Sequence, residues 1–272
     1  MPASPATTAA ERRALRWEIL LVLAITFGAS GARAALRLIE ALARPERLDR
    51  QTTTLNGAQS ALWWLDPAFQ LISTGVLCAW GGLAMFLLLR HVPAAAAPLR
   101  PTPAGTPTHR HPLRPRRADI LPGILLAAAI GLPGLAFYLA SLHLGLSKHV
   151  DAAGISAALG SGPGGHWYTL PLVILNAWAN GFAEELVVVA WLCTRMRQLR
   201  VPWGWVFAAS AVLRGSYHLY QGPSAGVGNV VMGLVFVWWY RRTGRVWPLI
   251  VAHGLIDTVA FAGSGLLGPV GG

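Results

Sequence analysis

The chain has 272 residues, of which 54% are hydrophobic and only 12% are charged, and its mean hydropathy is +0.49. This composition is typical of helices embedded in lipid and excludes an ordinary soluble domain. The formal net charge of +11 would suggest nucleic-acid binding in a soluble protein, but the basic residues fall mostly between apolar runs, where they set membrane orientation. We therefore expect an integral membrane protein that has no nucleic-acid partner.

Apolar runs of about 17 to 25 residues, the length that a helix needs to cross a bilayer, recur along the chain. They predict an all-α fold, a polytopic bundle of about seven transmembrane helices, within a range of about six to eight. In chain order the expected spans are 17–42, 68–89, 120–142, 167–196, 203–219, 224–240 and 246–266.

The first apolar run allows a second interpretation. Basic residues, an apolar stretch and then Ala32, Arg33 and Ala34 resemble a secretory signal with its cleavage site. Apolar and small residues continue to Ala43, which favours an uncleaved first helix.

Residues 91–118 are rich in Pro and Arg and predict a flexible cytoplasmic linker. This linker would separate an N-terminal pair of transmembrane helices, in residues 1–90, from a five-helix catalytic core in residues 119–272.

The distribution of basic residues predicts the orientation. With the N-terminus in the cytoplasm, fifteen of the 22 Lys and Arg residues fall in cytoplasmic segments. Arg33 and Arg37 lie within the first expected helix and are expected to extend toward the external surface. We expect a protein of the cell membrane, with the lipid bilayer as a partner.

Five ionisable side chains lie within the apolar stretches of the C-terminal part: Glu184, Glu185, His218, His253 and Asp257. A charge near the bilayer centre costs about 2.5 to 3.5 kcal/mol, so such residues usually serve a function. Counted at about 1.5 Å per residue from the flanking basic residues, all lie near mid-membrane. We therefore expect that three helices share one interior site.

The spacing along each helix supports this expectation. Residues four apart share a helix face, and the polar residues form such pairs on three expected helices: Asn180 with Glu184, Arg214 with His218, and His253 with Asp257.

At these residues the chain resembles the CPBP family of intramembrane glutamic endopeptidases, also called the CAAX-protease or Abi family. That family carries a Glu-Glu-x-x-x-Arg motif, then Phe-x-x-x-His, then His-x-x-x-Asn or Asp. Here the corresponding positions are Glu184 and Glu185, His218, and His253 with Asp257. The resemblance spans about residues 119–261.

The resemblance implies hydrolysis of a membrane-associated protein or peptide without a metal or other cofactor. Glu184 with His218 would activate water, and His253 with Asp257 would form or orient the oxyanion site. Glu185 completes the catalytic set, with Arg214 and Asn180 in supporting roles.

Two positions depart from the family pattern. Val189 stands where the family has arginine, and Arg214 stands where it often has phenylalanine. We hypothesise that Arg214 replaces the missing cation by pairing with Glu185, which leaves Glu184 free for chemistry. In the alternative, Arg214 extends toward the interface or binds backbone carbonyls.

Other functions use the same residues. Glu184, His218, His253 and Asp257 could bind Zn²⁺ in a metalloprotease. The cavity could also be a proton or solute pathway, or the protein could be a non-catalytic membrane scaffold. Substrate identity and oligomeric state stay open.

Overall fold

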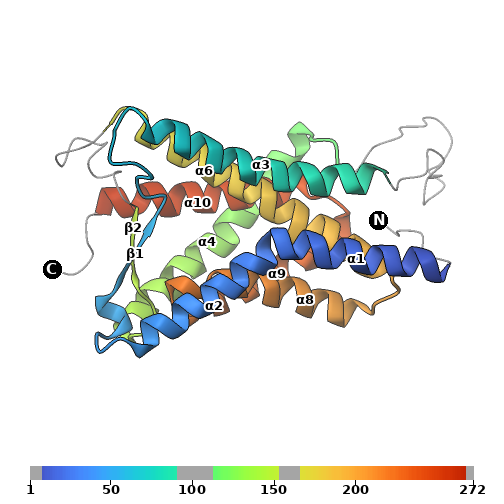
Figure 1. Cartoon of the computed structure of the whole chain (residues 1–272), viewed down its shortest axis with the longest axis horizontal. Helices are drawn as coiled ribbons and strands as arrows, with labels where there is room; N and C mark the ends of the chain where they lie inside the picture. Colours follow the sequence, from blue (N-terminus) through green and yellow to red (C-terminus); the bar gives the residue numbers. More distant parts are fainter. Residues whose placement is uncertain (1–7, 91–112, 153–165, 268–272) are drawn as a thin grey trace.

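The computed structural model describes residues 8–90, 113–152 and 166–267, so most of the expected linker lies outside the described residues. Helices form a bundle whose N-terminal and C-terminal parts pack against each other (Figure 1). The bundle is predominantly helical, as the sequence predicts. It also contains a small parallel sheet that the sequence did not predict, in which β1 (Thr52–Leu55) pairs with β2 (His149–Ala152).

The other elements follow one another along the chain with short connections. The α-helices are α1 Ala9–Ile25, α2 Phe27–Ala43, α3 Asp66–Arg90, α4 Ile120–His143, α6 Thr169–Glu184, α7 Leu192–Gln198, α8 Trp203–Tyr217, α9 Pro223–Thr243 and α10 Trp247–Leu267. A π-helix, η3 (Glu185–Trp191), joins α6 to α7. Short 3₁₀ turns are η1 Leu48–Arg50, η2 Arg117–Asp119 and η4 Leu219–Gln221.

The expected count of seven spans is not confirmed. In the described residues, three helical stretches are long and apolar enough to cross a bilayer, namely Asp66–Arg90, Arg117–His143 and Thr169–Gln198. The α1–α2 pair, bent by 46°, makes a fourth if it counts as one span. Helix α8 has 15 residues and reaches only about 22 Å, less than the roughly 30 Å of hydrocarbon.

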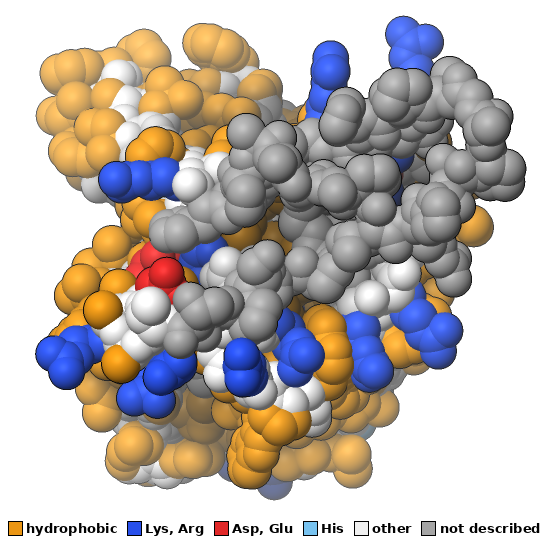
Figure 2. Space-filling model, turned by 90° about the vertical axis from the view of Figure 1, so that its right-hand side faces the viewer, with side chains coloured by type: hydrophobic (Ala, Val, Ile, Leu, Met, Phe, Trp, Pro, Cys, Tyr) orange, Lys and Arg blue, Asp and Glu red, His pale blue; other side chains and the backbone are white. Residues whose placement is uncertain are grey.

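The surface of the bundle is suited to lipid. Large apolar side chains are exposed on α3 and α4, where Ile72 is 65% exposed and Leu132 is 70% exposed. Exposed apolar surface of this extent marks contact with a membrane or a partner. Figure 2 looks at the end of the bundle where α1 begins and α3 ends, and shows Lys and Arg side chains gathered there among hydrophobic ones.

The core surrounds the α6–η3–α7 rod. Helix α6 packs against α3 and α10, and η3 contacts α3, α8 and α9. All seven residues of η3 are buried. This rod therefore carries the paired glutamates through the centre of the molecule.

A buried ionic contact attaches α1 to this rod. Arg195, expected in a cytoplasmic segment, is instead only 1% exposed. Its Nε donates to Glu18 Oε1 at 2.5 Å, and its Nη2 donates to the carbonyl of Leu87 at 2.7 Å. Trp191 Nε1 donates to the same Glu18 oxygen at 2.8 Å. One arginine thus connects α1, α3 and α7, which the linear sequence does not reveal.

Helices α6 and α10 approach very closely where the site is built. A Cβ added at Gly181 would lie 3.1 Å from the backbone nitrogen of Gly254 and 3.2 Å from His253 Cβ. A Cβ at Gly254 would lie 2.8 Å from the Trp178 ring. Glycine is therefore needed for the two helices to bring their polar side chains together.

We expect Gly181→Val to lower both stability and activity, because overpacking a tight contact costs about 1 to 3 kcal/mol and would displace His253. The measurement is the unfolding midpoint of the purified protein in detergent. The matched control is Gly75→Val in α3, where an added Cβ meets nothing within 4 Å. Equal midpoints for the two variants would contradict the proposed close packing.

Candidate active site

The paired glutamates lie at the junction of two helix types. Glu184 ends α6, and Glu185 begins the π-helix η3. A π-helix has a wider turn than an α-helix and is found mostly at functional sites. Here both consecutive carboxylates are buried, with Glu184 2% and Glu185 0% exposed, and both face Arg214 of α8.

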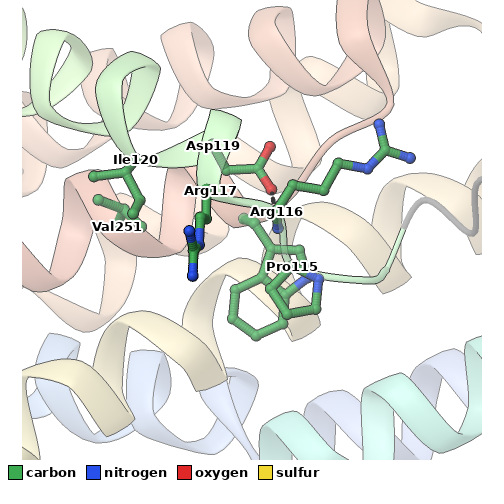
Figure 3. A pocket seen from close by; sticks show the side chains of 7 residues that line it. Pro115, Arg116, Arg117, Asp119, Ile120 and Val251 are labelled. Atoms are coloured by element: carbon green, nitrogen blue, oxygen red, sulfur yellow. Dashed lines mark hydrogen bonds between the residues drawn. The ribbon is translucent and has the colours of Figure 1, made fainter.

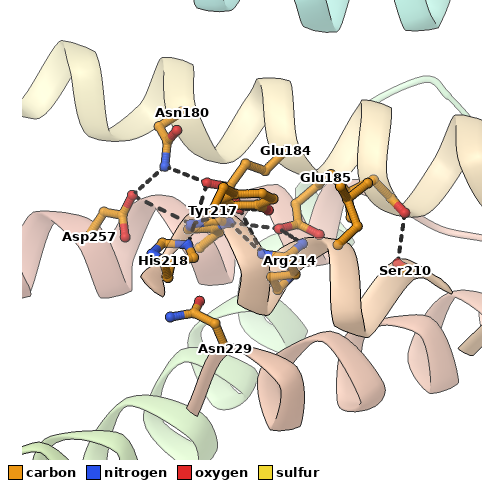
Figure 4. Close-up of polar contacts among 12 residues, drawn as sticks. Asn180, Glu184, Glu185, Ser210, Arg214, Tyr217, His218, Asn229 and Asp257 are labelled. Atoms are coloured by element: carbon orange, nitrogen blue, oxygen red, sulfur yellow. Dashed lines mark hydrogen bonds and ion pairs between the residues drawn. The ribbon is translucent and has the colours of Figure 1, made fainter. Parts of the chain in front are cut away.

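Arg214 bridges the two carboxylates (Figure 4). Its Nη1 donates to Glu184 Oε2 at 3.0 Å and its Nη2 donates to Glu185 Oε1 at 2.7 Å. The guanidinium also lies 5.3 Å from the centre of the Phe236 ring. The contact with Glu185 is the one that the sequence hypothesis required. The contact with Glu184 differs from that hypothesis, which left this glutamate free.

His253 of α10 lies among three carboxylates. Its Nδ1 is 2.6 Å from Glu185 Oε1, and its Nε2 is 3.5 Å from Asp257 Oδ2 and 3.9 Å from Glu184 Oε2. An ionised carboxylate can only accept a hydrogen bond, so Nδ1 carries a proton when Glu185 is charged. The ring is thereby oriented with Nε2 between Asp257 and Glu184.

Asn180 connects the two polar ridges of α6 and α10. Its Nδ2 donates to Glu184 Oε1 at 2.9 Å and to Asp257 Oδ2 at 3.0 Å. The two ridges expected from spacing of four residues therefore face each other across one site.

His218 and Tyr217 complete the cluster from the end of α8. The ring Nε2 of His218 lies 3.9 Å from Glu184 Oε1, beyond hydrogen-bond distance. Both ring nitrogens are buried without a hydrogen-bond partner among the described residues. Tyr217 Oη donates to Glu184 Oε2 at 2.5 Å.

Tyr217 is a site residue that the sequence reasoning missed. It lies outside the ridge of Arg214 and His218, whose spacing of four gave the helical signal. Helix α8 ends at Tyr217, so His218 no longer follows the helical register and neighbouring residues can face the same glutamate. The available signal was a polar aromatic residue directly before the histidine, inside an apolar run.

The site is a poor fit for a divalent metal. In the described part of the chain, Glu184, Glu185 and His253 each offer one ligand atom within 4.8 Å of the others. His218 and Asp257, which the zinc alternative includes, do not belong to this close set. Both glutamates of the set already accept hydrogen bonds from Arg214. A metal ion there would be repelled by a buried guanidinium.

A cavity of about 330 Å³ lies apart from these residues, at the start of α4 (Figure 3). Arg116, Arg117 and Asp119 line it together with apolar side chains such as Ile120 and Val251. Its carboxylate is bound by Arg245 and by the backbone N–H of Arg116. The lining residues in the described part of the chain include none of the predicted site residues, so we do not assign the reaction to this cavity.

Comparison with known proteins places the buried cluster in a family. Residues 166–259 match the family model described as type II CAAX prenyl endopeptidase Rce1-like. The chain is a CAAX-protease family member. The matched segment contains Asn180, Glu184, Arg214, His218 and Asp257, so it covers all three helices of the site. No curated protein and no solved structure matches the chain significantly. The family resemblance read from the motifs is thereby confirmed.

Within this CAAX-protease-like segment, the motif arginine is absent from its usual helix. Val189 lies in η3 with 0% exposure and offers no charge. The cation that contacts the paired glutamates comes instead from Arg214 on α8. This member of the family therefore reaches charge balance at the site from a different helix.

Proposed function

We propose that the protein is an intramembrane endopeptidase in which Glu184 and His218 activate water to hydrolyse a peptide bond of a membrane-associated substrate. The observation that carries this proposal is the 3.9 Å separation between Glu184 Oε1 and His218 Nε2. Two polar atoms at this distance can both bind one water molecule, although they cannot bind each other directly. The family match supports a protease of the CAAX type.

In this mechanism Glu184 is the general base. Its Oε2 accepts hydrogen bonds from Arg214 and Tyr217, while its Oε1 faces His218 and Asn180. These contacts hold the carboxylate in one orientation and direct Oε1 toward the water. The water oxygen attacks the carbonyl carbon, its proton passes to Glu184 or His218, and the same proton is delivered to the leaving amine.

His253 is placed to stabilise the oxyanion of the tetrahedral intermediate. Glu185 holds its Nδ1, and Asp257 lies 3.5 Å from its Nε2. A preorganised donor or positive charge at this point stabilises the negative oxygen that develops in the transition state. Asp257 and Glu185 therefore act by orienting His253.

We further propose that residues 119–272 form the catalytic core and that α1 to α3 pack against it as part of the same bundle, because α2 contacts α8 and α3 contacts α6. The cationic end in Figure 2 supports an orientation with this end, and with it the N-terminus, in the cytoplasm of a cell-membrane protein.

A zinc-dependent hydrolase is the second candidate, because three ligand atoms lie within 4.8 Å of one another. We expect the reconstituted protein to keep its activity after treatment with a chelator. Activity that is lost with the chelator and restored by Zn²⁺ would transfer the reaction to the metal alternative.

Comparative membrane proteomics of cells that carry the wild type or Glu184→Gln tests the proposed hydrolysis. We expect uncleaved membrane proteins or peptides to accumulate in the variant, with loss of their shortened products. The control is Glu46→Gln, which changes an exposed glutamate. Identical peptide profiles for wild type and Glu184→Gln, at equal expression, would favour transport or a scaffold role.

A further inference from the structure

A second cavity, of about 350 Å³, adjoins the site from the side of α2. Its lining includes Arg33 and Arg37 of α2, Lys148 before β2, and Tyr217 and Tyr220 near the end of α8. We call this cavity the basic pocket. It gathers three cations, and its described lining contains no carboxylate.

The positive charge of the basic pocket is incompletely balanced. Arg37 donates to Glu40 at 2.8 Å, but Arg44 shares the same carboxylate at 3.1 Å. Within the described residues, neither the guanidinium of Arg33 nor the ammonium of Lys148 has a hydrogen-bond or ion-pair partner. Burial, together with the nearby charge of Arg44, lowers the pKa of Lys148, which is the response of a cation without adequate compensation. An anion in the pocket would relieve this repulsion.

Tyr217 joins the basic pocket to the proposed reaction centre. It lines the pocket, and its hydroxyl donates to Glu184 Oε2 at 2.5 Å. One side chain therefore separates the pocket from the carboxylate that would activate water. A peptide whose scissile carbonyl lies beside Glu184 would extend across Tyr217 and enter the pocket within a few residues.

We propose that the basic pocket binds a carboxylate of the substrate peptide and so selects the bond to be cleaved. This inference rests on the proposed endopeptidase function. The carboxylate can come from the C-terminus of the substrate or from an acidic side chain near the scissile bond. A substrate group fits the position better than an independent anion, because an occupant next to Tyr217 must share the space with the peptide.

The test uses the full-length protein in phosphatidylcholine vesicles and one synthetic peptide mixture in three forms. The first form has a free C-terminal carboxylate and no acidic residues, the second has a C-terminal amide and internal Asp, and the third has an amide and no acidic residue. Cleavage sites and rates are read by mass spectrometry. We expect cuts within a few residues of a carboxylate in the first form, the second form or both, and little cleavage of the third. The responding form identifies the source of the carboxylate.

The variant R33Q/R37Q/K148Q removes the three cations. We expect it to lower kcat/KM for the carboxylate peptides by about 10- to 100-fold, mainly through KM, because charged hydrogen bonds to the substrate are lost. Its rate on the third form should stay unchanged. The control variant R13Q/R16Q/R242Q removes three exposed arginines outside the pocket and should match the wild type on all forms. The proposal is overturned if wild type cleaves all three forms equally or if the triple variant keeps the same preference.

A binding measurement separates this inference from the proposed function. If wild type cleaves no peptide, the hydrolase proposal fails, and the basic pocket is judged by the unfolding midpoint of Glu184→Gln with each form. Stabilisation by a carboxylate form that disappears in R33Q/R37Q/K148Q supports the pocket as a carboxylate site. Equal midpoints with all forms overturn it. Stabilisation by phosphatidylglycerol in the vesicles, and not by peptide, would assign the pocket to a lipid headgroup.

Discussion

Arg214→Leu is expected to abolish peptide cleavage and to reduce stability severely. The change would leave Glu184 and Glu185 buried, at 2% and 0% exposure, without the guanidinium that bridges them. Removal of one partner from a buried ion pair typically costs about 3 to 5 kcal/mol. The measurements are the thermal unfolding midpoint in detergent and the cleavage rate after reconstitution.

Two further variants distinguish the charge of Arg214 from its shape. Arg214→Lys keeps the charge but cannot contact two carboxylates with a planar fork, so we expect an intermediate midpoint. Combining Arg214→Leu with Glu185→Gln removes one carboxylate charge as well and should recover part of the stability. Arg214→Leu with a wild-type midpoint and wild-type cleavage would show that the site does not depend on this cation.

His218→Ala is expected to lower kcat by about 10²- to 10⁴-fold, the usual contribution of a positioned acid or base. Because its ring nitrogens have no hydrogen-bond partner among the described residues, the change should have little effect on stability. The split between a reduced kcat and an unchanged unfolding midpoint is therefore the informative result. Steady-state kinetics and thermal unfolding on the same preparation provide both values.

Tyr217→Phe is the matched comparison for His218→Ala. It removes only the hydroxyl that donates to Glu184 Oε2 and keeps the ring that lines the basic pocket. We expect a smaller loss of kcat than for His218→Ala, since Arg214 still holds the same oxygen. A larger loss for Tyr217→Phe would move the main proton-transfer role from His218 to the tyrosine.

Much of the candidate site was readable from the sequence because its signals are local. Buried ionisable residues are costly in an apolar helix, so Glu184, His218 and Asp257 were conspicuous. Spacing of four residues placed Asn180 with Glu184 on one helix face, and the structure brings that face to Asp257 of α10. The order of these motifs along the chain also indicated the family that the match over residues 166–259 confirms.

Other features were decided only by how the helices end and cross. The sequence predicted one helix over residues 17–42, but the chain bends by 46° between α1 and α2. It placed Arg214 against one glutamate, whereas the π-helix η3 and the crossing of α8 present both to it. The pairing of β1 with β2 joins strands nearly a hundred residues apart in the chain.

By itself, the sequence determined that this is a membrane protein with a polar site inside apolar helices, because the cost of a charge in lipid acts residue by residue. Tertiary structure alone decided that Tyr217 contacts Glu184, that Arg214 spans two carboxylates and that Arg33, Arg37 and Lys148 meet in one pocket. Those contacts depend on the close approach of α6 to α10 at Gly181 and on the end of α8 at Tyr217. Helical periodicity determines which residues share a face, but packing between distant segments determines which faces meet.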